Sequence, residues 1–309
     1  MEIKKNGKIT ASVGGLYTVE LDTGEKVSCR ARGSFRHLGT TPLVGDAVTL
    51  VGEGVETVID EIHERKNSLI RPPLANLDIL FVTLSAAKPE PSLFTADKLI
   101  AISEHNGIDP CIVVGKCELD PARAEEIKKI YELAGYPVFV LSCFENVGVK
   151  EFSEYVNTVI KGKTAAFAGA SGAGKSTLMN RLFPDLKLST GDVSQKTQRG
   201  KHTTRTVELF SLLGGYIADT PGFSMIDFER FDFFGKEDLP DTFKEFRECI
   251  GECKYKKCTH TKEEGCAILE AIREGKISTN RHKSFIAMYE DLKKTPDWKR
   301  RKEERNRHG

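Results

Sequence analysis

Short apolar runs that alternate with polar residues dominate the first 70 residues of the chain. They predict five strands separated by turns, at residues 8–13, 16–21, 26–31, 46–51 and 55–62. Five short strands in so short a stretch favour a small barrel, of which the five-stranded OB type is one solution. We therefore expect residues 1–71 to form an all-β, OB-like barrel.

The pattern of apolar and polar residues changes after Arg71-Pro72-Pro73, which we interpret as a linker. Apolar strands are expected at residues 79–84, 111–114, 138–141 and 164–168, with amphipathic helices at 95–104, 121–134, 149–160 and 176–183. A last hairpin turns at Gly214-Gly215. This alternation predicts a doubly wound α/β domain over residues 72–230, mostly parallel with an antiparallel edge.

Residues 231–309 are expected to form a third, mostly α domain. Its helices are predicted at residues 241–248, 267–274 and 278–294, followed by a basic tail after Pro296. The basic residues of the last helix and tail are Arg281, His282, Lys283, Lys293, Lys294, Lys299, Arg300, Arg301, Lys302, Arg305 and Arg307. They indicate either attraction to phosphates or a solvated, frayed helix, and the interspersed Glu303 and Glu304 favour the second interpretation.

One stretch of the α/β domain fits the phosphate-binding pattern G-x-x-x-x-G-K-[ST] at every fixed position. It reads Gly169, Ala170, Ser171, Gly172, Ala173, Gly174, Lys175 and Ser176, and Thr177 follows in the predicted helix. In such a loop the backbone N–H groups surround the phosphates, the lysine reaches the β and γ phosphates, and the hydroxyl ligates Mg²⁺. We predict a nucleoside triphosphate site at residues 169–177.

Further candidates for this site lie downstream. Asp219-Thr220-Pro221-Gly222 ends an apolar strand, where Asp219 can hold Mg²⁺ and the Gly222 N–H can meet a γ phosphate. In the polar segment between the phosphate loop and Asp219, either Thr203 or Thr204 is positioned to close on the Mg²⁺ ion and the γ phosphate.

The residue that orients the attacking water is not obvious. Signalling GTPases place a glutamine directly after Asp-x-x-Gly, and here that position is Phe223. His202 is the nearest substitute, although a loop histidine that is simply exposed to solvent is the alternative. The catalytic candidates are therefore His202, Lys175 and Thr204.

Two loops that resemble base-reading loops precede the phosphate loop. Gly115, Lys116, Cys117 and Glu118 follow one strand, and Ser142 and Cys143 follow the next. They are degenerate forms of the Asn-Lys-x-Asp and Ser-Ala loops that read guanine. GTPases usually carry these loops after the phosphate loop, so the order of the motifs is permuted.

Four of the eight cysteines lie within residues 249–266. The spacing Cys253-x4-Cys258-x-His260-x5-Cys266 offers three thiolates and one imidazole, a closed tetrahedral set suited to one structural Zn²⁺. A disulfide or free thiols are the less favoured alternative. Cys249 falls outside this spacing.

The net charge says little about binding partners, because 46 Lys and Arg residues nearly balance 45 Asp and Glu residues, which leaves a net charge of +1. The barrel carries Arg30, Arg32, Arg36, Arg65, Lys66 and Arg71. Oligonucleotide binding and ordinary surface charge are both open interpretations of that set. We expect no membrane span, no secretory signal and a reducing cytoplasmic location.

In the order of its motifs the chain resembles the circularly permuted GTPases of ribosome biogenesis, the family of ribosome small subunit-dependent GTPase A. The likeness spans nearly the whole chain, and it includes Gly45-Asp46, Arg71-Pro72, Asn76-Leu77-Asp78, Gly200-Lys201-His202-Thr203-Thr204, Asp219-Thr220-Pro221-Gly222-Phe223 and the cysteine cluster. The resemblance implies a GTP hydrolase that uses GTP/GDP, Mg²⁺ and Zn²⁺. It also implies binding to the small ribosomal subunit and its rRNA late in maturation, and we expect a monomer.

The base-reading loop departs from that family at two positions. The family usually has Asn where this chain has Gly115, and Asp where it has Glu118. Glu118 can still pair with the guanine N1–H and N2–H₂, whereas the lost Asn contact is worth about 0.5–1.5 kcal/mol, or roughly tenfold in affinity at most. We predict weakened guanine selectivity. Gly115 and Phe223 favour a rival interpretation, an RNA-binding assembly factor with a vestigial nucleotide site; a P-loop ATPase is a second rival, for which the Asp219 motif is less typical.

Overall fold

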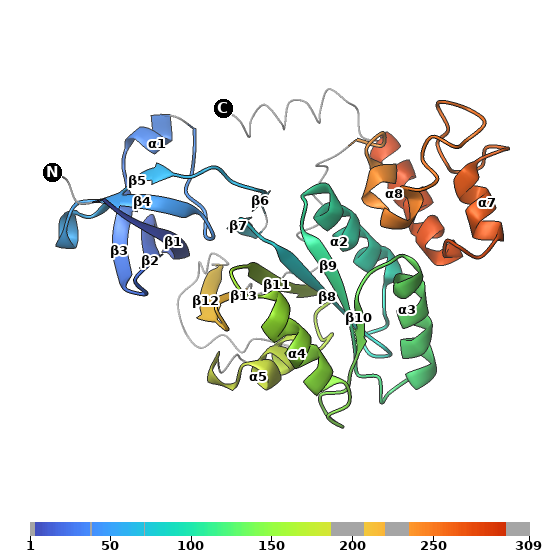
Figure 1. Cartoon of the computed structure of the whole chain (residues 1–309), viewed down its shortest axis with the longest axis horizontal. Helices are drawn as coiled ribbons and strands as arrows, with labels where there is room; N and C mark the ends of the chain where they lie inside the picture. The colour runs from blue at the N-terminus through green and yellow to red at the C-terminus, as the bar shows by residue number, and fades with distance from the viewer. Residues whose placement is uncertain (1–3, 38, 71, 187–206, 220–234, 295–309) are drawn as a thin grey trace.

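The chain folds into three parts arranged in a row, as the computed structural model in Figure 1 shows. The structure describes residues 4–37, 39–70, 72–186, 207–219 and 235–294. A β-barrel lies at one end, an α/β domain in the middle and a helical part at the other end. The predicted multidomain fold class is confirmed.

The N-terminal part is a closed five-stranded barrel. Its strands are β1 (Lys4–Val13), β2 (Leu16–Leu21), β3 (Lys26–Ala31), β4 (Ala47–Val51) and β5 (Val58–Ile62), with a short helix α1 (Ser34–His37) after β3. The strand order β1-β2-β3-β5-β4 is closed by pairing of β1 with β4. Inward-facing side chains such as Ile9, Val19 and Ile59 are fully buried. The last strand begins later than predicted, because Gly54–Glu56 forms a 3₁₀ turn.

The predicted linker, residues 71–73, falls within a small hairpin. Strand β6 (Ser68–Ile70) pairs with β7 (Pro73–Ala75). Directly after it, Asn76 adopts a left-handed backbone (φ 56°), and its side-chain amide donates to the Gly45 carbonyl at 3.0 Å. A Cβ on Gly45 would lie 2.1 Å from the Ala75 carbonyl oxygen, so only glycine fits there. These motif residues therefore fasten the barrel to the α/β domain.

Ion pairs within the chain occupy part of the barrel's positive charge. Arg65 forms a two-pronged pair with the fully buried Asp46, with Nε–Oδ1 and Nη2–Oδ2 distances of 2.7 Å. Arg32 pairs with Asp60, and Lys66 pairs with Asp78. Three of the six basic residues noted in the sequence thus have acidic partners, which weakens the barrel's attraction for phosphates.

The middle domain is a six-stranded sheet covered on both faces. Its strands are β8 (Ile79–Ser85), β9 (Asp109–Gly115), β10 (Val138–Val140), β11 (Thr164–Gly169), β12 (Glu208–Leu212) and β13 (Gly215–Asp219). Its helices are α2 (Leu93–His105), α3 (Pro121–Leu133), α4 (Val149–Val159) and α5 (Lys175–Leu182), with a 3₁₀ turn at Pro184–Leu186. The order is β10-β9-β8-β11-β13-β12, parallel except for the β12–β13 hairpin.

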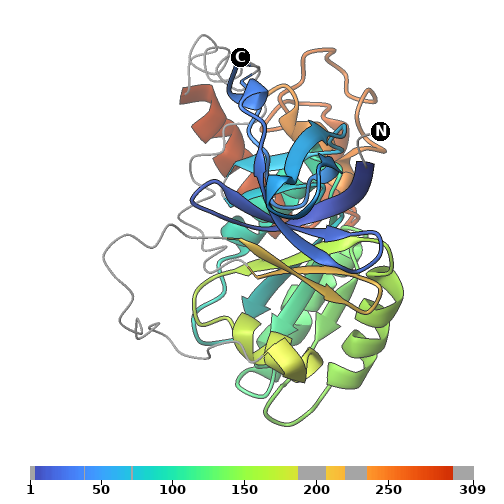
Figure 2. The ribbon, with the colours of Figure 1, turned by 90° about the vertical axis from the view of Figure 1, so that its left-hand side faces the viewer.

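Alternation along the central strand β8 explains why both faces are covered. Leu80 and Val82 join the hydrophobic core that holds α2 and α3, whereas Ile79 and Phe81 join the core that holds α4 and α5. A strand buried on both faces reads as a continuous apolar run, as this one does. The barrel continues the same sheet through the pairing of β1 with β12, at Ala11 and Glu208 (Figure 2).

The C-terminal part packs on α2, at the end of the α/β domain away from the barrel (Figure 1). Its elements are 3₁₀ turns at Leu239–Thr242 and Lys244–Phe246, α7 (Ala267–Arg273) and α8 (Thr279–Lys294). The helix predicted over residues 241–248 is wrong. Phe243 interrupts it with an extended backbone (φ −102°, ψ 99°), and its buried ring packs on Phe246 and Phe285 at centroid distances of 5.0 and 5.4 Å.

Two residues that we grouped with the basic surface of the last helix are buried. Arg281 has no exposed side-chain surface, and His282 donates from Nε2 to the His260 carbonyl at 2.7 Å. Neither is available to a phosphate. The basic tail after residue 294 lies outside the described residues. None of the helices in the described ranges combines the length and apolar character that a membrane crossing requires.

Candidate nucleotide site and cysteine–histidine cluster

The phosphate loop occupies the turn between β11 and α5. Gly169, Gly172 and Gly174 have φ values of 145°, 76° and 97°, which residues with a Cβ rarely adopt. Gly169 also has no space for a side chain, because a Cβ would lie 2.1 Å from the Thr83 carbonyl oxygen. The glycines of the sequence pattern are therefore required by the backbone path as well as by phosphate access.

Lys175 lies at the first position of α5 and folds back over its own loop. Its Nζ donates to the carbonyls of Gly169 and Ala170 at 2.8 Å each. Burial lowers the pKa of Lys175 to about 8. Ser176 and Thr177 follow in the same helical turn, with Ser176 half-buried.

The first base-reading loop is tied to the phosphate loop by Lys116. Its Nζ donates to the Gly172 carbonyl at 2.8 Å and to the Lys88 carbonyl at 2.7 Å, and its backbone is left-handed (φ 58°). The Cys117 N–H donates to the Leu141 carbonyl at 3.3 Å, which joins the two base-reading loops, while the Cys117 side chain packs against the larger core. The bond from Lys116 to Gly172 thus joins the first of these loops to the phosphate loop, across 56 positions of the chain.

A pocket of about 510 Å³ lies between these loops, which is within the usual size of small-molecule sites. Its lining includes Gly115, Lys116, Glu118, Cys143, Ala173, Gly174 and Thr177 from the predicted set, together with Thr83, Leu119, Leu141, Phe144, Glu145 and Leu178. Within the described part of the chain, the buried Oε2 of Glu118 has no hydrogen-bond partner. A buried carboxylate oxygen without a donor is costly, so this atom is suited to accept N–H groups from a ligand.

The second base-reading loop is a tight turn. Ser142 and Val147 exchange two backbone hydrogen bonds of 3.0 and 3.1 Å, and the fully buried Ser142 hydroxyl accepts from the Glu145 N–H at 3.0 Å. Ser142 therefore shapes the turn, while Cys143 and Phe144 line the pocket.

The elements predicted downstream are only partly described. Asp219 is the last residue of β13, which runs parallel to the phosphate-loop strand with Ala218 opposite Ala166. His202, Thr203, Thr204, Gly222 and Phe223 lie outside the described residues.

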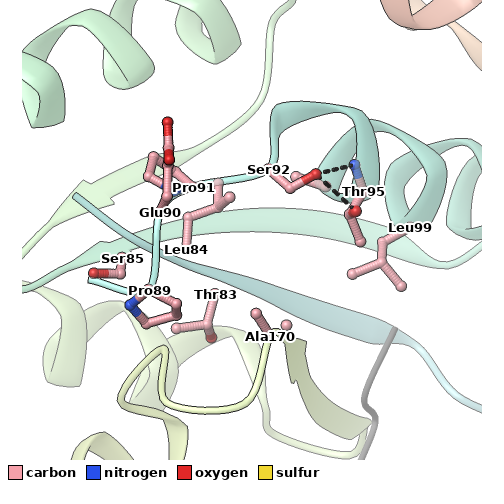
Figure 3. A pocket seen from close by; sticks show the side chains of 12 residues that line it. Thr83, Leu84, Ser85, Pro89, Glu90, Pro91, Ser92, Thr95, Leu99 and Ala170 are labelled. Carbon is pink, nitrogen blue, oxygen red and sulfur yellow. Dashed lines mark hydrogen bonds between the residues drawn. The ribbon is translucent and has the colours of Figure 1, made fainter. Parts of the chain in front are cut away.

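A second, smaller hollow lies on the other side of the phosphate loop, toward the beginning of α2 (Figure 3). It is lined by Thr83, Ala170 and the segment 89–92, and Ser92 caps the helix by accepting from the Thr95 N–H at 3.3 Å. Its volume of about 20 Å³ holds roughly one water molecule. Of these two pockets, only the larger has room for a ligand the size of a nucleotide.

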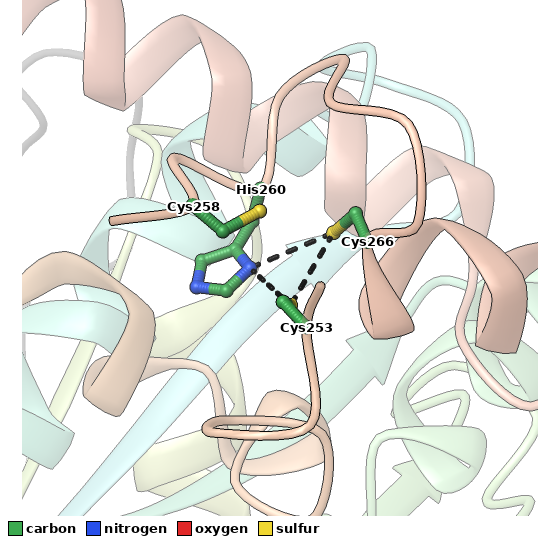
Figure 4. Close-up of side chains that lie close together, drawn as sticks. All are labelled: Cys253, Cys258, His260 and Cys266. Carbon is green, nitrogen blue, oxygen red and sulfur yellow. Dashed lines mark hydrogen bonds between the residues drawn. The ribbon is translucent and has the colours of Figure 1, made fainter. Parts of the chain in front are cut away.

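The four predicted zinc ligands converge in the C-terminal part (Figure 4). The His260 Nδ1 lies 3.5 Å from the Cys253 Sγ and 3.6 Å from the Cys266 Sγ, and the two sulfurs are 3.9 Å apart. All four ligand atoms, including the Cys258 Sγ, lie within 4.8 Å of one another. A tetrahedral zinc ion with bonds of about 2.3 Å would separate two sulfurs by about 3.8 Å, so the cluster fits zinc.

The profiles of two known protein families match much of the chain. The profile of the RsgA GTPase family matches residues 62–229, and that of the RsgA N-terminal domain matches residues 6–57. The chain belongs to the RsgA GTPase family.

Curated relatives are similar over nearly their whole length. A protein of Clostridium beijerinckii is 39% identical over 288 residues, covering 93% of this chain and 97% of the relative. A protein of Geobacillus is 41% identical over 292 residues, with the same coverage. Both are named small ribosomal subunit biogenesis GTPase RsgA.

Two solved structures share the fold of this chain. YjeQ from Thermotoga maritima superposes with a TM-score of 0.80 at 30% identity, over 95% of this chain and 100% of that one. YloQ, described as a circularly permuted GTPase, gives a TM-score of 0.76 at 32% identity, over 95% and 97%. The predicted permutation of the GTPase fold is confirmed.

Several pocket-lining residues were missed by the sequence reasoning. Leu119 and Phe144 immediately follow base-reading residues, so their proximity in the chain was an available signal. Thr83 comes from the end of β8, where no motif marks it. Only the register of β8 beside β11, with Thr83 opposite Gly169, places it at the site.

Proposed function

We propose that this RsgA-family GTPase hydrolyses GTP to GDP and phosphate on the small ribosomal subunit, whose binding stimulates turnover late in subunit maturation. The observation that carries the proposal is the unpartnered, buried Oε2 of Glu118 in a pocket continuous with the phosphate loop. The names of the curated relatives supply the ribosomal context.

Glu118 is the proposed reader of the guanine edge. Its carboxylate would accept from N1–H and N2–H₂, the two donors that adenine does not present. Gly115 contributes no side chain, so we infer lower guanine selectivity than an Asn would give. Lys116, Cys117, Ser142 and Cys143 position the loops around the base.

Residues 169–177 are proposed to hold the phosphates, with the Lys175 ammonium facing the β and γ phosphates. The Ser176 hydroxyl and Asp219 would hold Mg²⁺, which neutralises charge that develops on the transferred phosphoryl group. Gly222 would meet the γ phosphate, Thr204 would complete the metal site, and His202 would orient the attacking water.

Zn²⁺ is the proposed occupant of the Cys253, Cys258, His260 and Cys266 cluster, one ion per chain. Four protein ligands leave no open position, so its role would be structural. The Ala267 N–H that donates to the Cys253 Sγ at 3.3 Å supports thiolate character there.

We further propose that the parts divide at residues 1–71, 72–230 and 231–309, and that the outer two contact rRNA from opposite sides of the GTPase domain. Arg30 is an exposed basic residue of the barrel that takes no part in the ion pairs described above, so it is a candidate for contact with rRNA. A monomer in the cytoplasm is the simplest state for this role.

An assembly factor with a vestigial nucleotide site is the second candidate, and Gly115 is the observation that favours it. Glu118 argues against it. A pocket that no longer bound nucleotide would retain a buried, unpartnered carboxylate oxygen at a cost in stability and with no compensating ligand.

Binding to purified small ribosomal subunits tests the proposal. Affinity should be clearly higher with a non-hydrolysable GTP analogue than with GDP, because GTPases use contacts to the γ phosphate to select the conformation that binds a partner. Equal affinity in both states would contradict a nucleotide-controlled role and favour the vestigial site.

A further inference from the structure

An exposed aromatic ring lies at the mouth of the base pocket. Phe144 is 89% exposed, the highest value among the large apolar side chains of the described residues; Val13 follows at 66%. Single exposed apolar residues are ordinary on protein surfaces, but this one lines the proposed nucleotide pocket, beside Glu145, and the other described lining residues include no second aromatic ring. Leu119, 54% exposed, lines the same pocket.

The backbone that carries Phe144 is held firmly. The paired hydrogen bonds between Ser142 and Val147 close the turn beneath it, and the Asn146 side chain accepts from Arg181 Nη2 on α5 at 2.9 Å. The ring can therefore change rotamer while its Cα stays at the pocket edge. When a ligand comes to lie against the ring, only its two side-chain torsions have to be fixed, and no backbone segment has to become ordered.

We propose that Phe144 stacks on the face of the purine base of the bound guanine nucleotide. The inference rests on the proposed nucleotide site and adds a specific residue to it. The two side chains would contact different parts of the base. Glu118 reaches its polar edge, and the apolar ring of Phe144 covers its flat face, which water would otherwise solvate. Stacking of this kind compensates for the amide that Gly115 lacks.

The two contacts have separable consequences. Stacking tolerates any base, because every base has a π face, so Phe144 should add affinity without adding guanine selectivity. Glu118 should add affinity for GDP but not for ADP, since adenine lacks donors at the matching positions. Substituting each residue and comparing GDP with ADP distinguishes a stacking contact from a hydrogen bond.

Calorimetric titration of the full chain with GDP and ADP provides the test. Phe144→Ala should weaken GDP binding by about 5- to 150-fold and leave the GDP-to-ADP ratio unchanged, whereas Phe144→Tyr should bind within about twofold of the parent. Leu133→Ala is the matched control, since Leu133 is a 47% exposed apolar residue at the end of α3, away from the pocket lining.

A second readout does not depend on affinity. In a Trp298→Phe background, which removes the chain's single tryptophan, Phe144→Trp should show fluorescence quenching with GDP and none with inorganic pyrophosphate, which has no base. Phe144→Ala binding GDP like the parent, or a Trp signal insensitive to GDP, would overturn the stacking contact alone. A parent protein that binds no GDP would instead overturn the proposed nucleotide site.

Discussion

The Nη1 of Arg281 on α8 lies 2.6 Å from the Oδ1 of Asp97 on α2, and neither side chain is accessible to solvent. The same guanidinium donates from Nε to Glu245 at 2.8 Å and lies 4.5 Å from the centre of the Phe243 ring. One cation thus joins the helical C-terminal part to helix α2 of the GTPase domain. Burial raises the pKa of the Asp97 carboxyl, and the charge of Arg281 opposes that shift.

Removing this cation should be strongly destabilising. Arg281→Ala leaves two buried carboxylates without their partner, and we expect the free energy of unfolding to fall by about 3–5 kcal/mol, measured by denaturant titration. Arg273→Ala is the control, because Arg273 is 69% exposed and pairs with Glu270 on the surface. A change below about 1 kcal/mol for Arg281→Ala would show that the domains do not depend on this contact.

Metal removal should act on the C-terminal part alone. Helix α7, which directly follows the cluster, buries only Ile268 and Ala271, so zinc binding should contribute much of the stability there. Chelation or Cys258→Ser should unfold that part, seen by loss of hydrogen-exchange protection, while GDP affinity stays within a few fold. Cys249→Ser, which lies outside the cluster, should leave bound zinc unchanged. Retained protection after complete zinc loss would contradict a structural metal.

Restoring an amide at position 115 should strengthen guanine binding. A Cβ there would lie 3.5 Å from the Ala173 carbonyl oxygen and 3.7 Å from that of Leu84, which are ordinary contacts. Gly115→Asn should tighten GDP binding by up to about tenfold. Gly115→Ala adds the Cβ without the amide and should give no gain. If the two variants bind GDP equally, the missing amide has no bearing on affinity.

GDP binding should become weaker as the pH rises above about 8. Burial lowers the pKa of Lys175 to about 8 from its ordinary value of 10.5, whereas bound phosphates favour the ammonium and raise that pKa. Binding between the two values must then take up a proton. Calorimetry at about pH 9 in two buffers of different ionisation enthalpy should report uptake approaching one proton. Absence of proton uptake would contradict the shift.

The same shift fixes the sign of the pH dependence of folding without nucleotide. The folded pKa lies below the unfolded one, so the unfolded state holds more protons between about pH 8 and 10.5. The contribution of Lys175 to the free energy of unfolding therefore rises with pH across that interval. Lys175→Gln should abolish this contribution.

Local patterns predicted the parts of the site that depend on the backbone. The glycine pattern and the thiol–imidazole spacing act through the chain itself, so the loop at residues 169–176 and the convergence of the four cluster side chains could be predicted from the sequence. Apolar periodicity likewise predicted the barrel and the sheet. The helix expected over residues 241–248 failed because burial of Phe243 against Phe285, a contact distant in sequence, outweighs local propensity.

Charged residues were harder to interpret, because charge alone does not reveal burial. Arg281 and His282 read as part of a basic helix surface, yet one bridges two domains and the other supports the backbone of His260. Asp46 and Arg65 similarly satisfy each other inside the barrel. Only tertiary contacts distinguish such pairs from a surface that attracts phosphate.

GTP turnover with and without purified small ribosomal subunits tests the central claim most directly. Turnover of GTP should rise many-fold when subunits are added, turnover of ATP should stay near background, and Lys175→Ala should abolish the stimulated rate. GTP turnover that is unchanged by subunits, or ATP turnover equal to that of GTP, would contradict a GTPase stimulated by the small subunit.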